Sequence, residues 1–152
     1  MKDIKKLIKE NELDLSTLVV FTRAEHKIHK KEYQTIKESG LTPAQFGVLE
    51  ALYNKGDLKI YELIEKILTT SGNITVVIKN LEKDGLIKKN ADPEDKRSCI
   101  ISLTQKGKDF IEEILPKHIK NISNIFQILN DEEKVMLKSI LKKFKNIDRK
   151  SV

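Results

Sequence analysis

Apolar residues recur every three or four positions along most of the chain, and this spacing predicts a largely helical protein. The first run, residues 4–38, contains neither proline nor glycine and predicts helix up to a stop at Gly40. The next helix has a well-marked start, because Thr42 is a good N-cap and Gln45 completes a capping box. A proline follows the cap at the first helical position, and Gly56 supplies the stop.

Two further short helices are predicted in the middle of the chain, over residues 58–67 and 73–84, with a polar break between them. In the second helix, apolar residues fall at i, i+3, i+4 and i+7 and predict one buried face: Ile74, Val77, Ile78 and Leu81. The opposite face then carries short polar groups, one valine and one cation: Asn73, Thr75, Val76, Lys79 and Asn80. Such groups suit base edges, thymine methyls and phosphates.

A β-hairpin is predicted after these helices. Residues 86–89 and 99–103 can pair as its strands across a charged turn, residues 90–97. Alternation should place three side chains of the second strand on one inward face: Cys99, Ile101 and Leu103. Two short helices followed by a charged hairpin are the order of a winged helix-turn-helix, so the predicted fold class is mostly α with a small β-hairpin wing. This shape presents one helix to a DNA major groove and the hairpin to the backbone or minor groove beside it.

The two terminal segments, residues 1–38 and 104–152, carry more apolar surface than a small winged lobe could cover. An exposed apolar face of that length is a liability in a monomer. We therefore expect a single domain, residues 1–152, in which a winged helix-turn-helix lobe, residues 41–103, is joined to N- and C-terminal dimerisation helices. These helices should interlock with those of a second copy in a homodimer.

The composition limits which classes of binding partner are compatible with the chain. The net charge of +6 suits a polyanion such as double-stranded DNA, yet residues 54–97 hold 9 basic against 8 acidic side chains, so DNA binding depends on their arrangement. A single cysteine excludes an intrachain disulfide framework and a multi-cysteine zinc site. No stretch approaches the ~20 apolar residues of a membrane span, and the N-terminus lacks the apolar core of a signal peptide. We expect a cytoplasmic protein with no membrane partner.

Five short pieces make the chain resemble the MarR family of bacterial transcriptional regulators over nearly its whole length. They are residues 41–46, 71–75, 81–87, 92–97 and 103–107, which read LTPAQF, SGNIT, LEKDGLI, DPEDKR and LTQKG. The resemblance implies a triangular homodimer whose two winged lobes bind an inverted-repeat operator. It also implies a repressor that a small hydrophobic or phenolic effector, or an oxidant, releases from DNA.

Matching positions imply which side chains meet DNA. Together with the exposed helix face they form the predicted DNA-binding set: Thr70, Ser71, Asn73, Thr75, Val76, Lys79, Asn80, Lys96 and Arg97. By the resemblance, Arg97 enters the minor groove and Asp95 braces its guanidinium. Many relatives carry a second arginine where this chain has Lys96. Lysine keeps the charge but loses the planar fork, so we expect Lys96 to touch only phosphate.

Effector pockets in such dimers lie between the winged lobe and the dimer helices. Five side chains could line an apolar cavity there: Leu18, Phe21, Phe46, Tyr53 and Phe110. That composition favours an aromatic or other hydrophobic effector. Cys99 could be a redox switch, but its inward alternation and the lack of a cysteine near the first helix favour a buried apolar role.

Metal binding and catalysis have weaker support. His26 and His29 share a helical face beside Glu25 and could hold zinc. The third histidine, His118, is far away in the sequence, so exposed or interface histidines are the simpler interpretation, and no metal or cofactor is expected. There is no Gly-rich phosphate loop, nucleophile elbow or dense His/Asp/Glu cluster in the sequence, which argues against an enzyme.

Three functions remain open at this point. A ligand-responsive, sequence-specific repressor is the leading one. An architectural or nonspecific DNA-binding protein without an effector is the alternative, and the ratio of operator to random-DNA affinity at fixed salt separates the two. A winged domain used only for protein contacts is the third, and the cations Lys79 and Arg97 argue against it.

Overall fold

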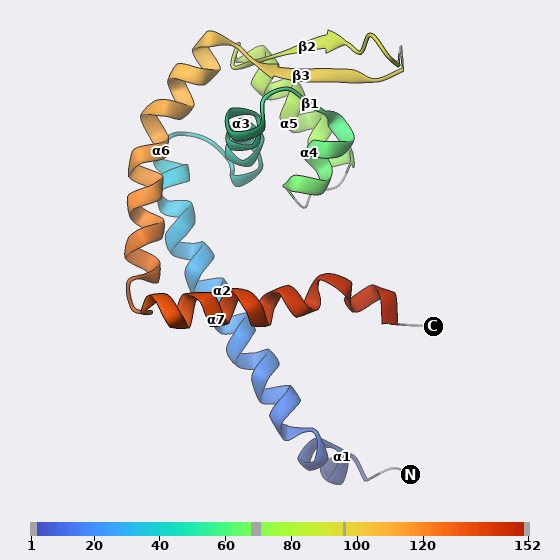
Figure 1. Ribbon diagram of the computed structural model, residues 1–152, viewed down its shortest axis with the longest axis vertical. Coiled ribbons are helices and arrows are strands. Elements are labelled where there is room, and N and C mark those ends of the chain that lie inside the picture. Colours follow the sequence, from blue (N-terminus) through green and yellow to red (C-terminus); the bar gives the residue numbers. More distant parts are fainter. Residues whose placement is uncertain (1–2, 68–70, 96, 151–152) are drawn as a thin grey trace.

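A computed structural model describes residues 3–67, 71–95 and 97–150 and confirms the mostly α fold class (Figure 1). Its elements, in chain order, are α1 (Ile4–Glu10), α2 (Glu12–Glu38), α3 (Pro43–Lys55), β1 (Leu58–Lys59), α4 (Ile60–Lys66), α5 (Ser71–Lys83), β2 (Ile87–Ala91), β3 (Cys99–Leu103), α6 (Gln105–Phe126), α7 (Asp131–Lys142) and the 3₁₀ helix η1 (Lys143–Lys150). The elements from α3 to β3 form the winged lobe. α6 runs down one side of this lobe and lies beside α2, and α1 and α7 extend away from them (Figure 1).

The first helical run is divided at Asn11, which the sequence pattern did not predict. The Nδ2 group of Asn11 donates to the Leu7 carbonyl (2.8 Å), and its φ of −115° departs from helical geometry. α2 then runs unbroken to Glu38, and Gly40 takes the left-handed φ of +80° that ends it. Residues 4–38 are therefore helical as predicted, but in two pieces.

The predicted start of α3 is confirmed. The Oγ1 atom of Thr42 accepts the Gln45 N–H (3.2 Å), and the Oε1 atom of Gln45 accepts the Thr42 N–H (2.9 Å), which completes the capping box. Gly56 ends the helix with a φ of +80°. α3 is the first helix of the winged lobe, and its capped start fixes how it follows the end of α2.

The sheet has three antiparallel strands in the order β1-β3-β2. The sequence pattern assigned residues 58–67 to one helix, but Leu58 and Lys59 pair with β3 as the short strand β1. β3 is thus a central strand, and its predicted alternation was partly wrong: Ser102 is buried and Cys99 only half-buried. The buried Ser102 hydroxyl accepts a hydrogen bond from the Asn90 amide (3.1 Å) on the neighbouring strand, which makes its burial tolerable.

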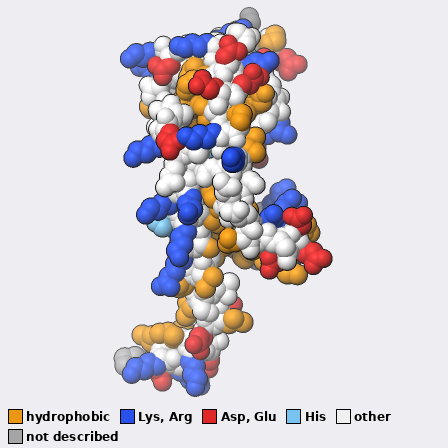
Figure 2. All heavy atoms as spheres, turned by 90° about the vertical axis from the view of Figure 1, so that its left-hand side faces the viewer, with side chains coloured by type: hydrophobic (Ala, Val, Ile, Leu, Met, Phe, Trp, Pro, Cys, Tyr) orange, Lys and Arg blue, Asp and Glu red, His pale blue; other side chains and the backbone are white. Residues whose placement is uncertain are grey.

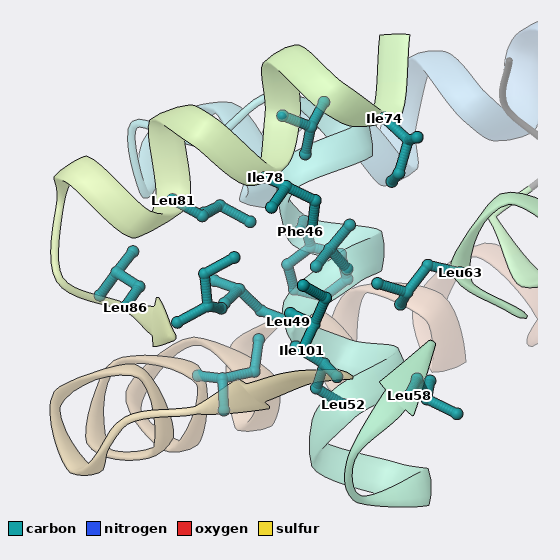
Figure 3. Packing of buried hydrophobic residues seen from close by; sticks show 14 of the residues in the cluster. Phe46, Leu49, Leu52, Leu58, Leu63, Ile74, Ile78, Leu81, Leu86 and Ile101 are labelled. Carbon is teal, nitrogen blue, oxygen red and sulfur yellow. The ribbon is translucent and has the colours of Figure 1, made fainter. Parts of the chain in front are cut away.

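The core of the winged lobe lies where α3, α4 and α5 meet β3 and the first turns of α6 (Figure 3). Its innermost side chains are Val48, Leu49, Leu63, Ile74, Ile78, Leu81, Ile101 and Ile111, each at most 1% exposed. All four apolar residues predicted for the inner face of α5 are buried. Burying each such side chain stabilises the fold by about 1.5–3 kcal/mol, so the core fixes the rotation of α5 about its own axis.

A tight junction joins the winged lobe to α6. The hydroxyl of Thr104 donates to the Gly85 carbonyl (2.6 Å) and accepts the Gly107 N–H (3.0 Å) at the start of α6. A Cβ atom on Gly107 would lie only 1.9 Å from the carbonyl oxygen of Leu86. The sequence LTQKG therefore builds a contact in which only glycine fits, and this contact sets the direction in which α6 leaves the lobe.

The seam between α2 and α6 contains a small polar cluster. The Oγ1 atom of Thr35 lies 3.0 Å from Nδ1 of the buried His118, whose ring packs against Phe46 with centroids 4.5 Å apart. The Nδ2 group of Asn121 donates to the Lys31 carbonyl (2.9 Å). α6 continues through Pro116 as one helix. The seam thus couples α2, α6 and, through Phe46, the first helix of the winged lobe.

Candidate nucleic-acid interface

The exposed face of α5 is the first part of the candidate interface. Every described residue predicted for this face is exposed: Asn73, Thr75, Val76, Lys79 and Asn80. Val76 is 57% exposed, although it is apolar, and it stands between polar neighbours. A short apolar group with hydroxyl, amide and ammonium groups beside it can contact thymine methyls, base edges and phosphates.

The side chains of three residues of the predicted DNA-binding set lie outside the described part of the structure. Thr70 and Lys96 lie outside the described residues. Ser71 opens α5, and only its backbone is described. Their DNA contacts stay predictions.

The hairpin tip is the second part of the candidate interface. Arg97 is exposed there, in the turn between β2 and β3. The Oδ1 atom of Asp95 accepts the backbone N–H of Arg97 (2.9 Å), and the Asp95 carbonyl accepts the Ser98 N–H (2.9 Å). Within the described residues no ion pair joins the Asp95 carboxylate to the Arg97 guanidinium. The carboxylate thus holds the backbone of Arg97 rather than its side chain, which leaves the guanidinium available to a partner.

An ion pair at the base of the hairpin was not predicted from the sequence. The Oδ2 atom of Asp92 lies 2.7 Å from Nζ of Lys59, and the carboxylate is almost fully buried, with 1% of the side chain exposed. Lys59 lowers the pKa of Asp92, aided by the Glu94 N–H, which donates to Oδ1 (2.9 Å). The same pair raises the pKa of Lys59. The sequence alone did not predict this ion pair, because the two residues are 33 positions apart and meet only through the unpredicted pairing of β1 with β3.

A pocket of about 660 Å³ opens between α2, α3 and the end of α4. Its lining combines aromatic and aliphatic groups with charged side chains, among them His29, Tyr33, Phe46, Lys55 and Ile67. The Nδ1 atom of His29 lies 2.6 Å from Oε2 of Glu32, and its ring stacks on Tyr33 at 5.3 Å. Burial and the neighbouring glutamates raise the pKa of Tyr33. The pocket therefore offers an aromatic wall and groups that can hydrogen-bond a polar ring substituent.

The structure does not bring the five predicted pocket residues together within one chain. Only Phe46 lines the pocket. Leu18 and Phe21 lie on the part of α2 that extends beyond the lobe, and they are 62% and 50% exposed. The Tyr53 hydroxyl donates to Glu112 on α6 (3.1 Å), and Phe110 packs on the core. The sequence did not predict that His29 and Tyr33 line the pocket, because this depends on how α2 packs against α3.

The described residues contain neither a metal-ligand cluster nor a membrane-spanning helix. No cluster of three or more His, Cys, Asp or Glu side chains there could hold a metal ion. His29 is held between Glu25 (3.4 Å) and Glu32 on one helix, whereas His118 is buried in the α2–α6 seam. No helix among the described residues is both long and apolar enough to cross a membrane.

A recognition helix with a fixed polar face, beside a hairpin that exposes an arginine, defines a winged helix-turn-helix DNA-binding protein. Residues 41–99 match the MarR family. The chain is also 36% identical over 132 residues to the HTH-type transcriptional regulator MhqR of Bacillus subtilis, covering 87% of this chain and 91% of MhqR. The chain belongs to the MarR family and is a DNA-binding transcriptional regulator.

Solved structures show the same architecture. The MarR family regulator Sco3205 of Streptomyces coelicolor, solved in complex with DNA, superimposes with a TM-score of 0.82 at 20% identity over 90% of this chain and 92% of that one. BpsR of Bordetella bronchiseptica, whose DNA binding is regulated by 6-hydroxynicotinic acid, gives a TM-score of 0.76 at 28% identity over 86% of this chain and 98% of that one. The winged fold predicted from the sequence is thereby confirmed.

Proposed function

We propose that this protein binds an inverted-repeat operator as a homodimer, with α5 in the major groove and Arg97 in the minor groove of each half-site. The observation that carries the proposal is the division of α5 into a fully buried apolar face and an exposed face of groups suited to base edges. Arg97 is exposed on the hairpin turn, where Asp95 holds its backbone N–H. Thr70, Ser71 and Lys96 complete the proposed contact set.

A second copy of this chain is the proposed cover of the exposed apolar arms. Large apolar side chains that are at least 45% exposed are spread over α1, α2, α7 and η1: Ile4, Leu7, Ile8, Leu13, Leu15, Leu18, Val19, Val20, Phe21, Val135, Met136, Ile140, Phe144 and Ile147. They gather on the projecting parts of the molecule, away from the winged lobe (Figure 2). Such patches mark interaction sites in soluble proteins, and a two-fold dimer would match the symmetry of an inverted repeat.

The pocket between α2 and α3 is the proposed effector site. It lies where the dimer arm meets the winged lobe, so a ligand there would bias the orientation of the lobe. His29, Tyr33 and Phe46 suit a small aromatic molecule with a polar substituent, and BpsR provides a precedent in a hydroxylated aromatic acid. We propose a repressor that such a ligand releases from DNA in the cytoplasm.

Selection of bound duplexes from random genomic fragments, followed by footprinting, tests this proposal. The selected sites should contain an inverted repeat with half-site centres about one helical turn apart, ~10–11 base pairs, and both halves should be protected. Sedimentation at micromolar concentration should give a dimer. Protection of a single half-site, or selection that enriches no sequence, would favour a nonspecific architectural binder instead.

A further inference from the structure

Lys59 and Asp92 connect the wing to the helix-turn-helix. Asp92 is the first residue after β2, and its N–H donates to the Ser98 carbonyl across the hairpin (3.3 Å). Lys59 lies on β1 and directly precedes α4, where its N–H donates to Oε2 of Glu62 (2.8 Å). The 2.7 Å ion pair between their side chains therefore joins the base of the wing to the start of the helix that packs on α5.

The same carboxylate shapes the turn that carries Arg97. The Oδ1 atom of Asp92 accepts the Glu94 N–H, and Asp95 in turn accepts the N–H groups of Arg97 and Ser98. Asp92 thus anchors a chain of short contacts that ends at the backbone of Arg97. A displacement of Asp92 would displace the whole turn.

Charge explains why both partners are needed. A buried carboxylate that loses its cation is strongly unfavourable and would turn out towards water. Asp92 is 1% exposed at its side chain and has Lys59 as its counter-ion, while the Lys59 side chain is 28% exposed. Each charge is neutralised by the other, so neither residue is suited to serve as a phosphate contact.

We propose that Lys59 and Asp92 are positioning residues for DNA binding: their ion pair sets the angle at which the wing presents Arg97 to the minor groove. The inference rests on the wing contact proposed above and extends it to two residues that need not touch DNA.

Opposite charge changes provide the test. If only net charge mattered, Lys59→Met would weaken binding to the selected operator and Asp92→Asn would strengthen it. Positioning predicts that both weaken it, by about tenfold, within the roughly 5- to 150-fold range expected when one specific contact is lost. The double variant should be no weaker than either single variant, and Lys59→Arg should bind like the wild type. Glu94→Gln is the matched control, because it removes an exposed acidic charge from the same turn and should not weaken binding.

Hydroxyl-radical footprints separate positioning from a general loss of structure. In Lys59→Met and Asp92→Asn, probed well below the lowered melting transition of each variant, protection of the outer minor groove should fade while protection at the α5 contacts persists. Equal loss of both protections in step with the melting temperature, or tighter binding by Asp92→Asn, would overturn the proposal. If Arg97→Ala leaves the wild-type flank protection intact, the wing contact itself fails. If Arg97→Ala removes that protection but Asp92→Asn retains it, only the positioning role fails.

Discussion

Gly107→Ala should destabilise the protein severely, because the methyl group has no room. Its Cβ would lie 1.9 Å from the Leu86 carbonyl oxygen, 2.9 Å from the Leu86 carbonyl carbon and 3.2 Å from Cδ2 of Leu103. The two nearest atoms belong to the backbone, and the Leu86 oxygen also accepts the Thr104 N–H (3.1 Å), so relief requires the junction to open.

The magnitude follows from comparison with ordinary overpacking. An extra methyl in a packed core costs typically ~1–3 kcal/mol, and a clash with fixed backbone belongs at or above the upper end, about 3 kcal/mol or more. The gain in helix propensity from Gly to Ala offsets at most ~1 kcal/mol of this. The net loss of about 2–4 kcal/mol is a large part of a typical stability of ~5–15 kcal/mol. At about 2–4 °C per kcal/mol for a domain of this size, melting should fall by roughly 4–16 °C.

Two other glycines serve as matched controls. A Cβ at Gly47 would lie 3.2 Å from the side-chain Cγ2 of Ile67, and one at Gly72 would meet nothing within 4 Å. Denaturant unfolding at one fixed protein concentration should therefore give Gly107→Ala a much lower free energy of unfolding than Gly47→Ala, and Gly47→Ala a lower one than Gly72→Ala. If Gly107→Ala were as stable as Gly72→Ala, the tight junction between the winged lobe and α6 would be refuted.

The remaining predictions concern charge, dimerisation and readout. Lys59 lowers the pKa of Asp92 in the folded protein below its value of about 4 in the unfolded chain. The stability that this carboxylate adds is therefore present above about pH 4, and it is lost as the pH falls through the folded-state pKa. Unfolding curves of wild type and Asp92→Asn should thus differ by a constant amount from pH 8 to 5 and converge below about pH 4; a gap that grows on acidification would contradict this. Leu18→Asp should shift the proposed dimer towards monomer in sedimentation whereas Gln34→Asp on the same helix should not, and equal behaviour would exclude this face from the proposed interface. Thr75→Ala should relax base preference in a half-site and leave the salt slope nearly unchanged, so a reduced slope with intact preference would mean a phosphate contact only.

The helices of this protein were predictable because their signals are local. The capping box of Thr42 and Gln45 and the buried stripe of α5 follow from spacing within a few residues, and the structure has both. The wing was predicted as a two-stranded hairpin, but β1 was missed. Two residues carry no strand signal of their own, and Leu58 becomes a strand only by pairing with Ile101.

Parts of the site depended on contacts that no local pattern encodes. The exposed face of α5 was predictable as the complement of its buried face. The Lys59–Asp92 pair required the β1–β3 pairing, and the pocket residues His29 and Tyr33 required the crossing of α2 over α3. Asp95 was expected to hold the Arg97 guanidinium, yet its carboxylate reaches the nearer backbone N–H two residues on. In this Asx-type turn, the backbone N–H of Arg97 is the nearer donor, and binding it does not require the long arginine side chain to be ordered.

The exposed face of α5 is proposed to distinguish one DNA sequence from another. The most direct measurement is the ratio of dissociation constants for the selected operator and for a scrambled duplex of the same length and composition, at one salt concentration near 150 mM. Specific readers typically bind their sites at least ~10³-fold more tightly than unrelated DNA. We expect a ratio of that order, reduced sharply when Asn73 and Thr75 are both replaced by Ala. A ratio near one, unchanged by that double replacement, would contradict this proposal.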